Sequence, residues 1–168
     1  AIIQARGASP GEVAHHLDAA GPAHRVAAAA AHLEAARQAR RWADHETAWH
    51  HSSRALSALR HHPEQLRARF DATFGLAAAV TATHGPRAAE GPYADAVALA
   101  RELDDPLLAA RAAAKHDIEY FLDASAVQTQ LDTCRAALAA IPEGDSTERV
   151  ILTAQLGTAA LAGIDVAA

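Results

Sequence analysis

Three alanine-rich stretches of this chain lead in a similar way to a proline. The prolines are Pro63, Pro106 and Pro142, roughly 43 and 36 residues apart. The stretches before them are 54–59, 96–101 and 135–140. Because alanine is the best helix former and proline ends helices, each stretch predicts the end of a helix. A spacing of about 40 residues is typical of two-helix repeats, whose units bury an apolar face only by stacking. The chain is therefore predicted to fold as a stacked helical array.

The composition supports an all-helical fold. Of the 168 residues, 51% are hydrophobic but only 4% are aromatic, and alanine supplies much of the apolar fraction. Small side chains favour helices that approach closely over a core of bulky groups. β-branched residues never alternate with polar ones over a useful length, so we expect no sheet. The single cysteine, Cys134, excludes an internal disulfide and a multi-cysteine zinc site, and we expect it to be buried.

Capping and stop signals set the expected helix bounds. Ser9, Pro10 and Glu12 have the pattern of a capping box, and Asp44, Asp105 and Asp145 are candidate N-caps farther along. Gly-Pro pairs at 21–22 and 85–86 are stops, and a third at 91–92 should kink the fifth helix or delay its start. We expect helices at about 10–20, 23–41, 44–61, 64–83, 87–103, 105–122, 125–140 and 145–163.

The hairpins formed by these helices follow the tetratricopeptide pattern in part. Its second helix carries small residues seven apart with a larger one between them. The matching triplets are Ala48, Ser52, Ala55, then Ala89, Tyr93, Ala96, and less well Gln130, Cys134, Ala137. We predict antiparallel hairpins stacked as a tetratricopeptide-like right-handed superhelix, a plain helical bundle being the alternative. The single domain would cover 1–168, with a linking helix at 10–22, degenerate repeats at 23–63, 64–106 and 106–142, and a partial repeat at 143–168.

Patterns of catalytic and cofactor-binding residues are largely missing. His45 to His50 is similar to the zinc-protease H-E-x-x-H with one residue added, but histidines five apart on a helix diverge by about 140°. The chain has neither a phosphate-binding loop nor a nucleophile elbow. We therefore expect no enzyme, no metal and no cofactor, and a histidine-ligated metallohydrolase is only a remote alternative. The net charge of -5 gives no reason for nucleic-acid contact.

The sequence also suggests where the chain acts and where a partner binds. No stretch is apolar enough for a membrane span, so a cytoplasmic location is expected, and the lack of any methionine indicates a fragment of a longer protein. In a tetratricopeptide array the first helix of each pair lines the concave groove. The register places there Leu33, Arg37, Arg40, Arg41, Asp71, Phe74, Lys115 and Glu119. These residues would form a basic groove for a carboxylate-bearing peptide or acidic effector; the alternative is that they are ordinary solvated charges.

Four segments resemble one family of bacterial regulators. Residues 12–21 are similar to its "E-[LI]-A-H-H-Y/L-…-A-G" helix, and residues 47–56 to "E-E-A-x-x-H-Y-x-R-A-L". Residues 98–106 resemble "A-L-A-R-E-L-G-D-P", and residues 137–146 resemble "A-L-A-L-L-P-E-G-D-S". The motifs occur in the family's order over nearly the whole chain. They resemble the helical region of large ATP-binding LuxR-type and antibiotic-pathway activators, which are signal-transduction ATPases.

This resemblance implies a non-catalytic sensor or scaffold segment that binds an effector or a partner protein. ATP and DNA binding would then belong to other modules of the parent protein. The main alternative is a free-standing tetratricopeptide adaptor that binds a peptide in its concave groove. An array of this kind also exposes a terminal repeat through which copies of the chain can associate.

Overall fold

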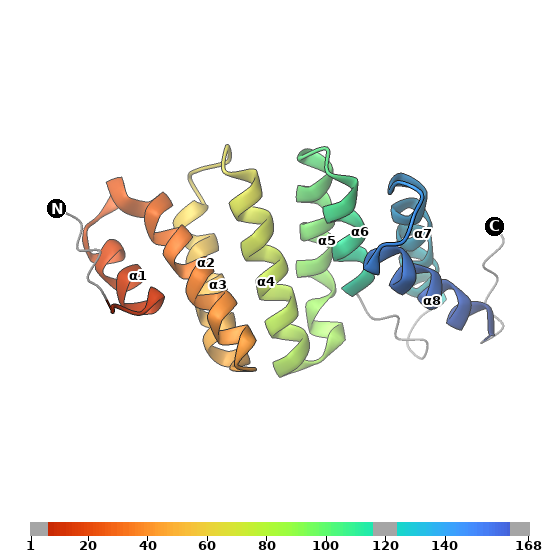
Figure 1. Cartoon of the computed structure of the whole chain (residues 1–168), viewed down its shortest axis with the longest axis horizontal. Helices are drawn as coiled ribbons and strands as arrows, with labels where there is room; N and C mark the ends of the chain where they lie inside the picture. Colours follow the sequence, from red (N-terminus) through yellow and green to blue (C-terminus); the bar gives the residue numbers. More distant parts are fainter. Residues whose placement is uncertain (1–6, 116–123, 162–168) are drawn as a thin grey trace. The chain divides into compact units, whose positions relative to one another are not determined.

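The structure is a computed structural model that describes residues 7–115 and 124–161. Every regular element in these two ranges is helical, as the sequence predicts (Figure 1). The elements are α1 (Pro10–Ala19), the 3-10 turn η1 (Pro22–His24), α2 (Arg25–Arg41), α3 (His45–Leu59), α4 (Leu66–His84), α5 (Pro86–Glu102), α6 (Pro106–Lys115), α7 (Ala124–Ala140) and α8 (Thr147–Leu161).

The chain divides into two compact units, Ala1–Thr83 and His84–Ala168. This division reflects where contacts concentrate, and it falls close to the end of α4. The single domain that the sequence predicts over 1–168 stays a prediction. The predicted repeat boundaries are a finer division and stay a prediction.

The start of the first unit follows the capping signals closely. The Ser9 hydroxyl accepts a hydrogen bond from the Glu12 amide (3.3 Å), and the Glu12 carboxylate accepts one from the Ser9 amide (2.7 Å). This reciprocal pair is the predicted capping box, and it satisfies donors that the first helical turn leaves open. Asp44 caps α3 in the same way by accepting from the Thr47 amide (3.1 Å). Pro22 begins a 3-10 turn, so α2 starts at Arg25, slightly later than expected.

Small side chains lie where α2, α3 and α4 pack together. One cluster of buried residues joins the three helices, and a second lies farther along them. The first comprises Ala29, Leu33, Ala55, Leu59 and Ala72, and the second Ala39, Ala48 and Ala79. Ala48 and Ala55, the two alanines of the first matching triplet, are fully buried in these clusters. Ala89 and Ala96, the alanines of the second triplet, are also fully buried. A methyl group at a crossing lets helices approach closely, to about 8–10 Å between axes.

The second unit is built from α5, α6, α7 and α8. Consecutive helices pack against each other, and α6 also packs against α8. In the first unit, α2 and α4 likewise share a buried cluster. Within each unit one helix therefore packs against both its neighbour and the helix after that.

The starts of α5 and α8 agree with expectation to different degrees. α5 spans Pro86–Glu102, close to the predicted 87–103; of the two effects predicted for Pro92, a kink or a delayed start, the delayed start does not occur. An internal proline removes one backbone hydrogen bond and its ring crowds the preceding turn, so Pro92 has a local energetic cost within α5. The α8 cap is Ser146 rather than Asp145: its hydroxyl accepts from the Arg149 amide (3.1 Å), and the helix begins one residue later than Asp145 would allow.

Two other expectations for this unit are confirmed. Asp105 caps α6 by accepting from the Leu108 amide (3.0 Å). Cys134 is fully buried on α7, and its thiol donates to the Gln155 carboxamide oxygen on α8 (3.3 Å). The predicted end of the sixth helix near residue 122 lies outside the described residues. Over the two described ranges, no helix has the length and apolar character of a membrane span.

Candidate functional site

The residues predicted to line a concave groove divide between the two units. Arg37, Arg40 and Arg41 lie on α2, and Asp71 and Phe74 lie on α4. Lys115 is the last residue of α6, its side chain is not among those described, and Glu119 lies outside the described residues. The side chains of this set that the structure describes therefore all belong to the first unit.

Leu33 is a correction to this prediction. It is 7% exposed and belongs to the cluster that joins α2, α3 and α4. A leucine that fills the space between helices stabilises the array and offers little surface to a partner. The periodicity of α2 alone does not show that α3 and α4 cover Leu33.

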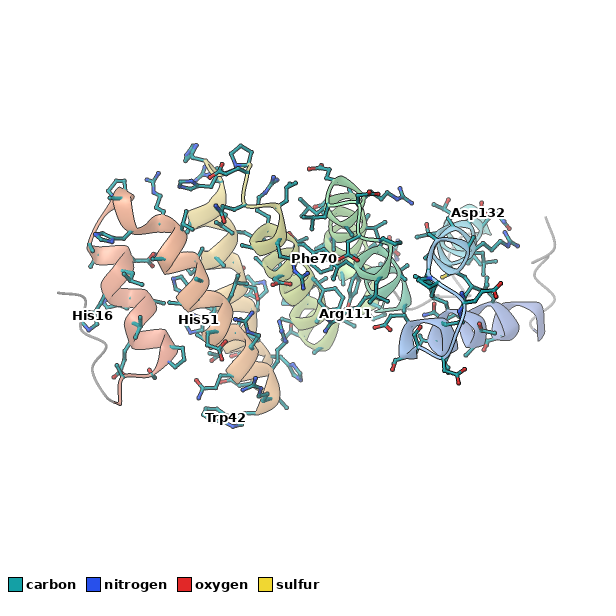
Figure 2. The ribbon with its side chains drawn as sticks, turned by 45° about the horizontal axis from the view of Figure 1, so that its top comes forward. His16, Trp42, His51, Phe70, Arg111 and Asp132 are labelled. Carbon is teal, nitrogen blue, oxygen red and sulfur yellow. The ribbon has the colours of Figure 1, made fainter. Side chains whose placement is uncertain are left out.

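The remaining groove residues are partly engaged with their own helices. Arg37 Nε donates to Glu34 Oε2 (3.0 Å), and Asp71 Oδ1 lies 3.4 Å from Arg67 Nε. The Phe74 ring stacks on Phe70, with 5.8 Å between ring centroids; Phe70 is labelled in Figure 2. These neighbouring side chains reduce the net charge and the apolar surface that the predicted groove residues present to a partner.

A chain of polar side chains links α1, α2 and α3 of the first unit. His32 of α2 is 3% exposed, and its Nε2 lies 3.1 Å from Asp18 Oδ2 on α1. The other ring nitrogen, Nδ1, lies 2.9 Å from Nδ1 of His51 on α3, which Figure 2 labels. Arg54 Nη2, one turn beyond His51, donates to the same Asp18 oxygen.

The direction of these hydrogen bonds follows from the charge on Asp18. An ionised carboxylate only accepts, so His32 Nε2 carries a proton. With both rings neutral, His32 Nδ1 accepts from His51 Nδ1–H, which leaves His51 Nε2 as the unprotonated nitrogen. Gly11 lies against this end of the His51 ring, since a Cβ built on Gly11 would be 3.4 Å from His51 Nε2.

The surroundings keep Asp18 ionised and His51 neutral. Burial alone raises the pKa of Asp18, but hydrogen bonds from Arg54 and His32 outweigh it and hold that pKa below its usual value. The pKa of His51 is lowered, first by its partial burial and then by the neighbouring charges of His32 and His50. The network therefore favours an ionised Asp18 and a neutral His51.

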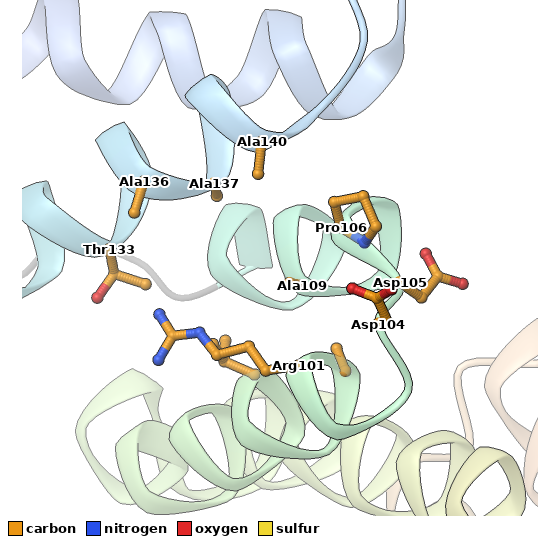
Figure 3. A pocket seen from close by; sticks show the side chains of 11 residues that line it. Arg101, Asp104, Asp105, Pro106, Ala109, Thr133, Ala136, Ala137 and Ala140 are labelled. Atoms are coloured by element: carbon orange, nitrogen blue, oxygen red, sulfur yellow. The ribbon is translucent and has the colours of Figure 1, made fainter.

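A cavity of about 510 Å³ lies between α5, α6 and α7 of the second unit (Figure 3). Alanines and Pro106 form most of its wall. The Arg101 side chain of α5 extends toward Thr133 of α7, while Asp104 and Asp105 lie toward the other end (Figure 3). Asp105 is already engaged as the α6 cap. Arg101 and Asp104 thus place opposite charges at two ends of an apolar space.

The cavity owes its size to the short side chains around it. Ala109, Ala136, Ala137 and Ala140 contribute only methyl groups where larger residues would fill the gap between helices. The volume is within the range of roughly 300–1,000 Å³ that is typical of small-molecule sites.

The histidines considered as metal ligands do not come together. His45 begins α3 and His50 is exposed one turn later. Within residues 7–115 and 124–161, no three histidine, cysteine, aspartate or glutamate side chains are grouped as a metal site.

Sequence reasoning did not identify the Asp18–His32–His51–Arg54 network. One signal was present, because His32 interrupts the apolar face formed by Ala28, Ala29 and Ala36 of the same helix. A histidine on a face that will be buried needs hydrogen-bond partners. Its partners lie 14 and 19 residues away on two other helices, however, and a single-helix pattern does not identify them.

The chain matches no protein-family model, no curated protein and no solved structure.

Proposed function

We propose that this chain is a non-catalytic helical-repeat segment of a bacterial transcriptional regulator, in which it binds an effector or a partner protein. The regulator would belong to the ATP-binding LuxR-type or antibiotic-pathway activators, the family that four ordered segments of the sequence resemble. The tetratricopeptide-like superhelix is part of this proposal. It is supported by the buried alanines at helix crossings and by the packing of α6 against both α7 and α8.

The cavity between α5, α6 and α7 is the observation that favours a binding role. It has the volume of a ligand site, an apolar wall, and the charged groups of Arg101 and Asp104 toward its ends. A molecule with an apolar body and a polar group at each end would complement this arrangement. Binding there would bridge three successive helices and so change how they pack, which is how a sensor segment transmits occupancy.

The family assignment has a direct test in the full-length gene. The reading frame should encode a phosphate-binding-loop ATPase before this segment and a helix-turn-helix after it. A complete gene without these modules would contradict the regulator and leave the free-standing adaptor.

The cavity has a separate test in the full-length protein. Ala136→Trp should fill the cavity and abolish the effector response. The response is measured as transcription from a promoter that the regulator controls. Ala139→Trp is the matched control, because Ala139 is also exposed on α7 but does not line the cavity. Equal responses in the two variants would exclude the cavity as the effector site.

The adaptor alternative is supported by the α2 and α4 residues. Arg40 and Phe74 are half-buried and Arg41 is exposed, so cationic and aromatic groups occur together on the first unit. An acidic peptide would pair with the guanidinium groups. Unchanged affinity for such a peptide in the folded Arg37→Ala/Arg41→Ala protein would remove this groove from consideration.

A further inference from the structure

A second cavity, of about 270 Å³, lies in the first unit where the end of α1, the start of α2 and the end of α3 come together. Its polar lining consists mainly of basic groups. Arg25 comes from the first turn of α2, Arg54 from α3, and Arg60 and His61 from the residues just after α3. Asp18 is the one carboxylate among the residues that line it.

The cations outnumber the anion in this cavity. Arg54 is paired with Asp18, whereas Arg25 and Arg60 have no ion pair or hydrogen bond from their side chains within the described ranges. Three guanidinium groups and one carboxylate give a formal charge of +2 in a chain whose net charge is -5. The two helix C-termini and one N-terminus nearby contribute about half an elementary charge each, so their sum of roughly -0.5 does not cancel it.

The helix dipole accounts for an arginine at position 60 but not for one at position 25. A cation just after a helix C-terminus, such as Arg60, interacts favourably with the helix dipole. Arg25 is the first residue of α2, where the dipole is positive and a cation is unfavourable. Arg25 is exposed, and an anion held in the cavity would offset its unfavourable position at the helix start.

The network of Asp18, His32, His51 and Arg54 positions the third cation. Arg54 donates to Asp18 Oδ2, and the same oxygen is 3.1 Å from Nε2 of buried His32. Because His32 is fixed between two helices, Asp18 is held in place and in turn orients the Arg54 guanidinium. A preorganised guanidinium loses less conformational entropy when it binds an anion.

We propose that this cavity binds the phosphoryl group of a small phosphorylated molecule, with Arg25 and Arg60 as its direct ligands and Arg54 as a fixed third cation. A phosphate dianion matches the local charge of +2, whereas a single carboxylate would leave part of it uncompensated. Guanidinium groups bind phosphate oxygens in bidentate geometry. The volume lies just below the range of drug-sized sites, which starts at roughly 300 Å³, so the ligand is a small phosphate ester. This proposal does not depend on the regulator assignment.

The test uses the whole chain at constant physiological ionic strength. Inorganic phosphate is titrated into ¹⁵N-labelled protein, and succinate is titrated in parallel as a dicarboxylate. Phosphate should shift the amide signals of Gly21, Ala28 and Ala58, which line the cavity, and should bind more tightly than succinate. Arg25→Ala/Arg60→Ala should weaken phosphate binding by roughly tenfold or more, the usual effect of losing charge-assisted hydrogen bonds.

The matched control is Arg67→Ala/Arg87→Ala, which removes the same charge from exposed residues of α4 and α5 outside the cavity. It should bind phosphate as the wild type does. Arg25→Lys/Arg60→Lys, which keeps the charge but loses the bidentate geometry, should have intermediate affinity. The proposal is overturned if phosphate shifts signals equally across the surface, if both double alanine variants weaken binding alike, or if succinate binds more tightly. Because wild-type signals report the site directly, a variant that fails to fold does not remove the test.

Discussion

Ala55 offers a direct test of how the first unit is packed. It is fully buried on α3, in one cluster with residues of α2 and α4. Ala55→Leu replaces a methyl by an isobutyl group at this crossing. If a void could hold the added carbons, their burial would stabilise the fold by roughly 2 kcal/mol. Neither cavity is lined by Ala55, however, so the new atoms must push helices apart.

The net expectation is a loss of about 1–3 kcal/mol of unfolding free energy, the usual cost of overpacking. For a chain of this size each kcal/mol corresponds to roughly 2–4 °C, so the melting temperature should fall by about 2–12 °C. Urea unfolding followed by circular dichroism at 222 nm measures the free energy, and calorimetry measures the melting temperature.

Ala30→Leu is the control for this substitution. Ala30 is exposed on α2, so the same chemical change should alter stability by less than about 0.5 kcal/mol. If Ala55→Leu unfolds at the same urea concentration as Ala30→Leu, the close crossing of α2, α3 and α4 at Ala55 is refuted.

Three further substitutions test the cap, the close approach at Gly75 and the histidine pair. Ser9→Ala should destabilise by about 1 kcal/mol through loss of the capping box, whereas Ala8→Ser should change little; equal melting temperatures would contradict the cap. Gly75→Ala should not deliver the roughly 1 kcal/mol that alanine normally adds within a helix, because its Cβ would lie 2.5 Å from Arg40 Nη1 and 3.0 Å from the buried Ser52 Oγ. A gain of that full size in urea unfolding would show that both contacts are relaxed. Since the pKa of His51 is lowered by folding, the unfolded chain takes up more protons below about pH 6.5, and stability should fall from pH 7.5 to 5.5. His51→Gln should reduce this fall, and an unchanged pH dependence of the urea midpoint would contradict it.

Helix ends were predictable where one short segment contains the whole signal. Ser9 and Glu12 cap each other within a single turn, and Asp44 and Asp105 each cap through an amide three residues on. The sequence was less reliable where two adjacent residues suit an N-cap: Asp145 was predicted, but Ser146 accepts the capping hydrogen bond of α8. Local rules predicted that Pro92 would kink the fifth helix or delay its start, and α5 instead begins before Pro92 and continues through it.

The sequence by itself determined that the chain is helical, where most helices begin, and which alanines of the matching triplets are buried, because propensity, caps and periodicity act within one or two helical turns. Only the tertiary structure decided that Leu33 belongs to the core, that His32 joins Asp18 to His51, and that Arg25, Arg54 and Arg60 line one cavity. Each of these relations connects residues on different helices. They depend on how far each helix is rotated and shifted against the next, and in an alanine-rich chain many such arrangements satisfy the same pattern of small apolar residues.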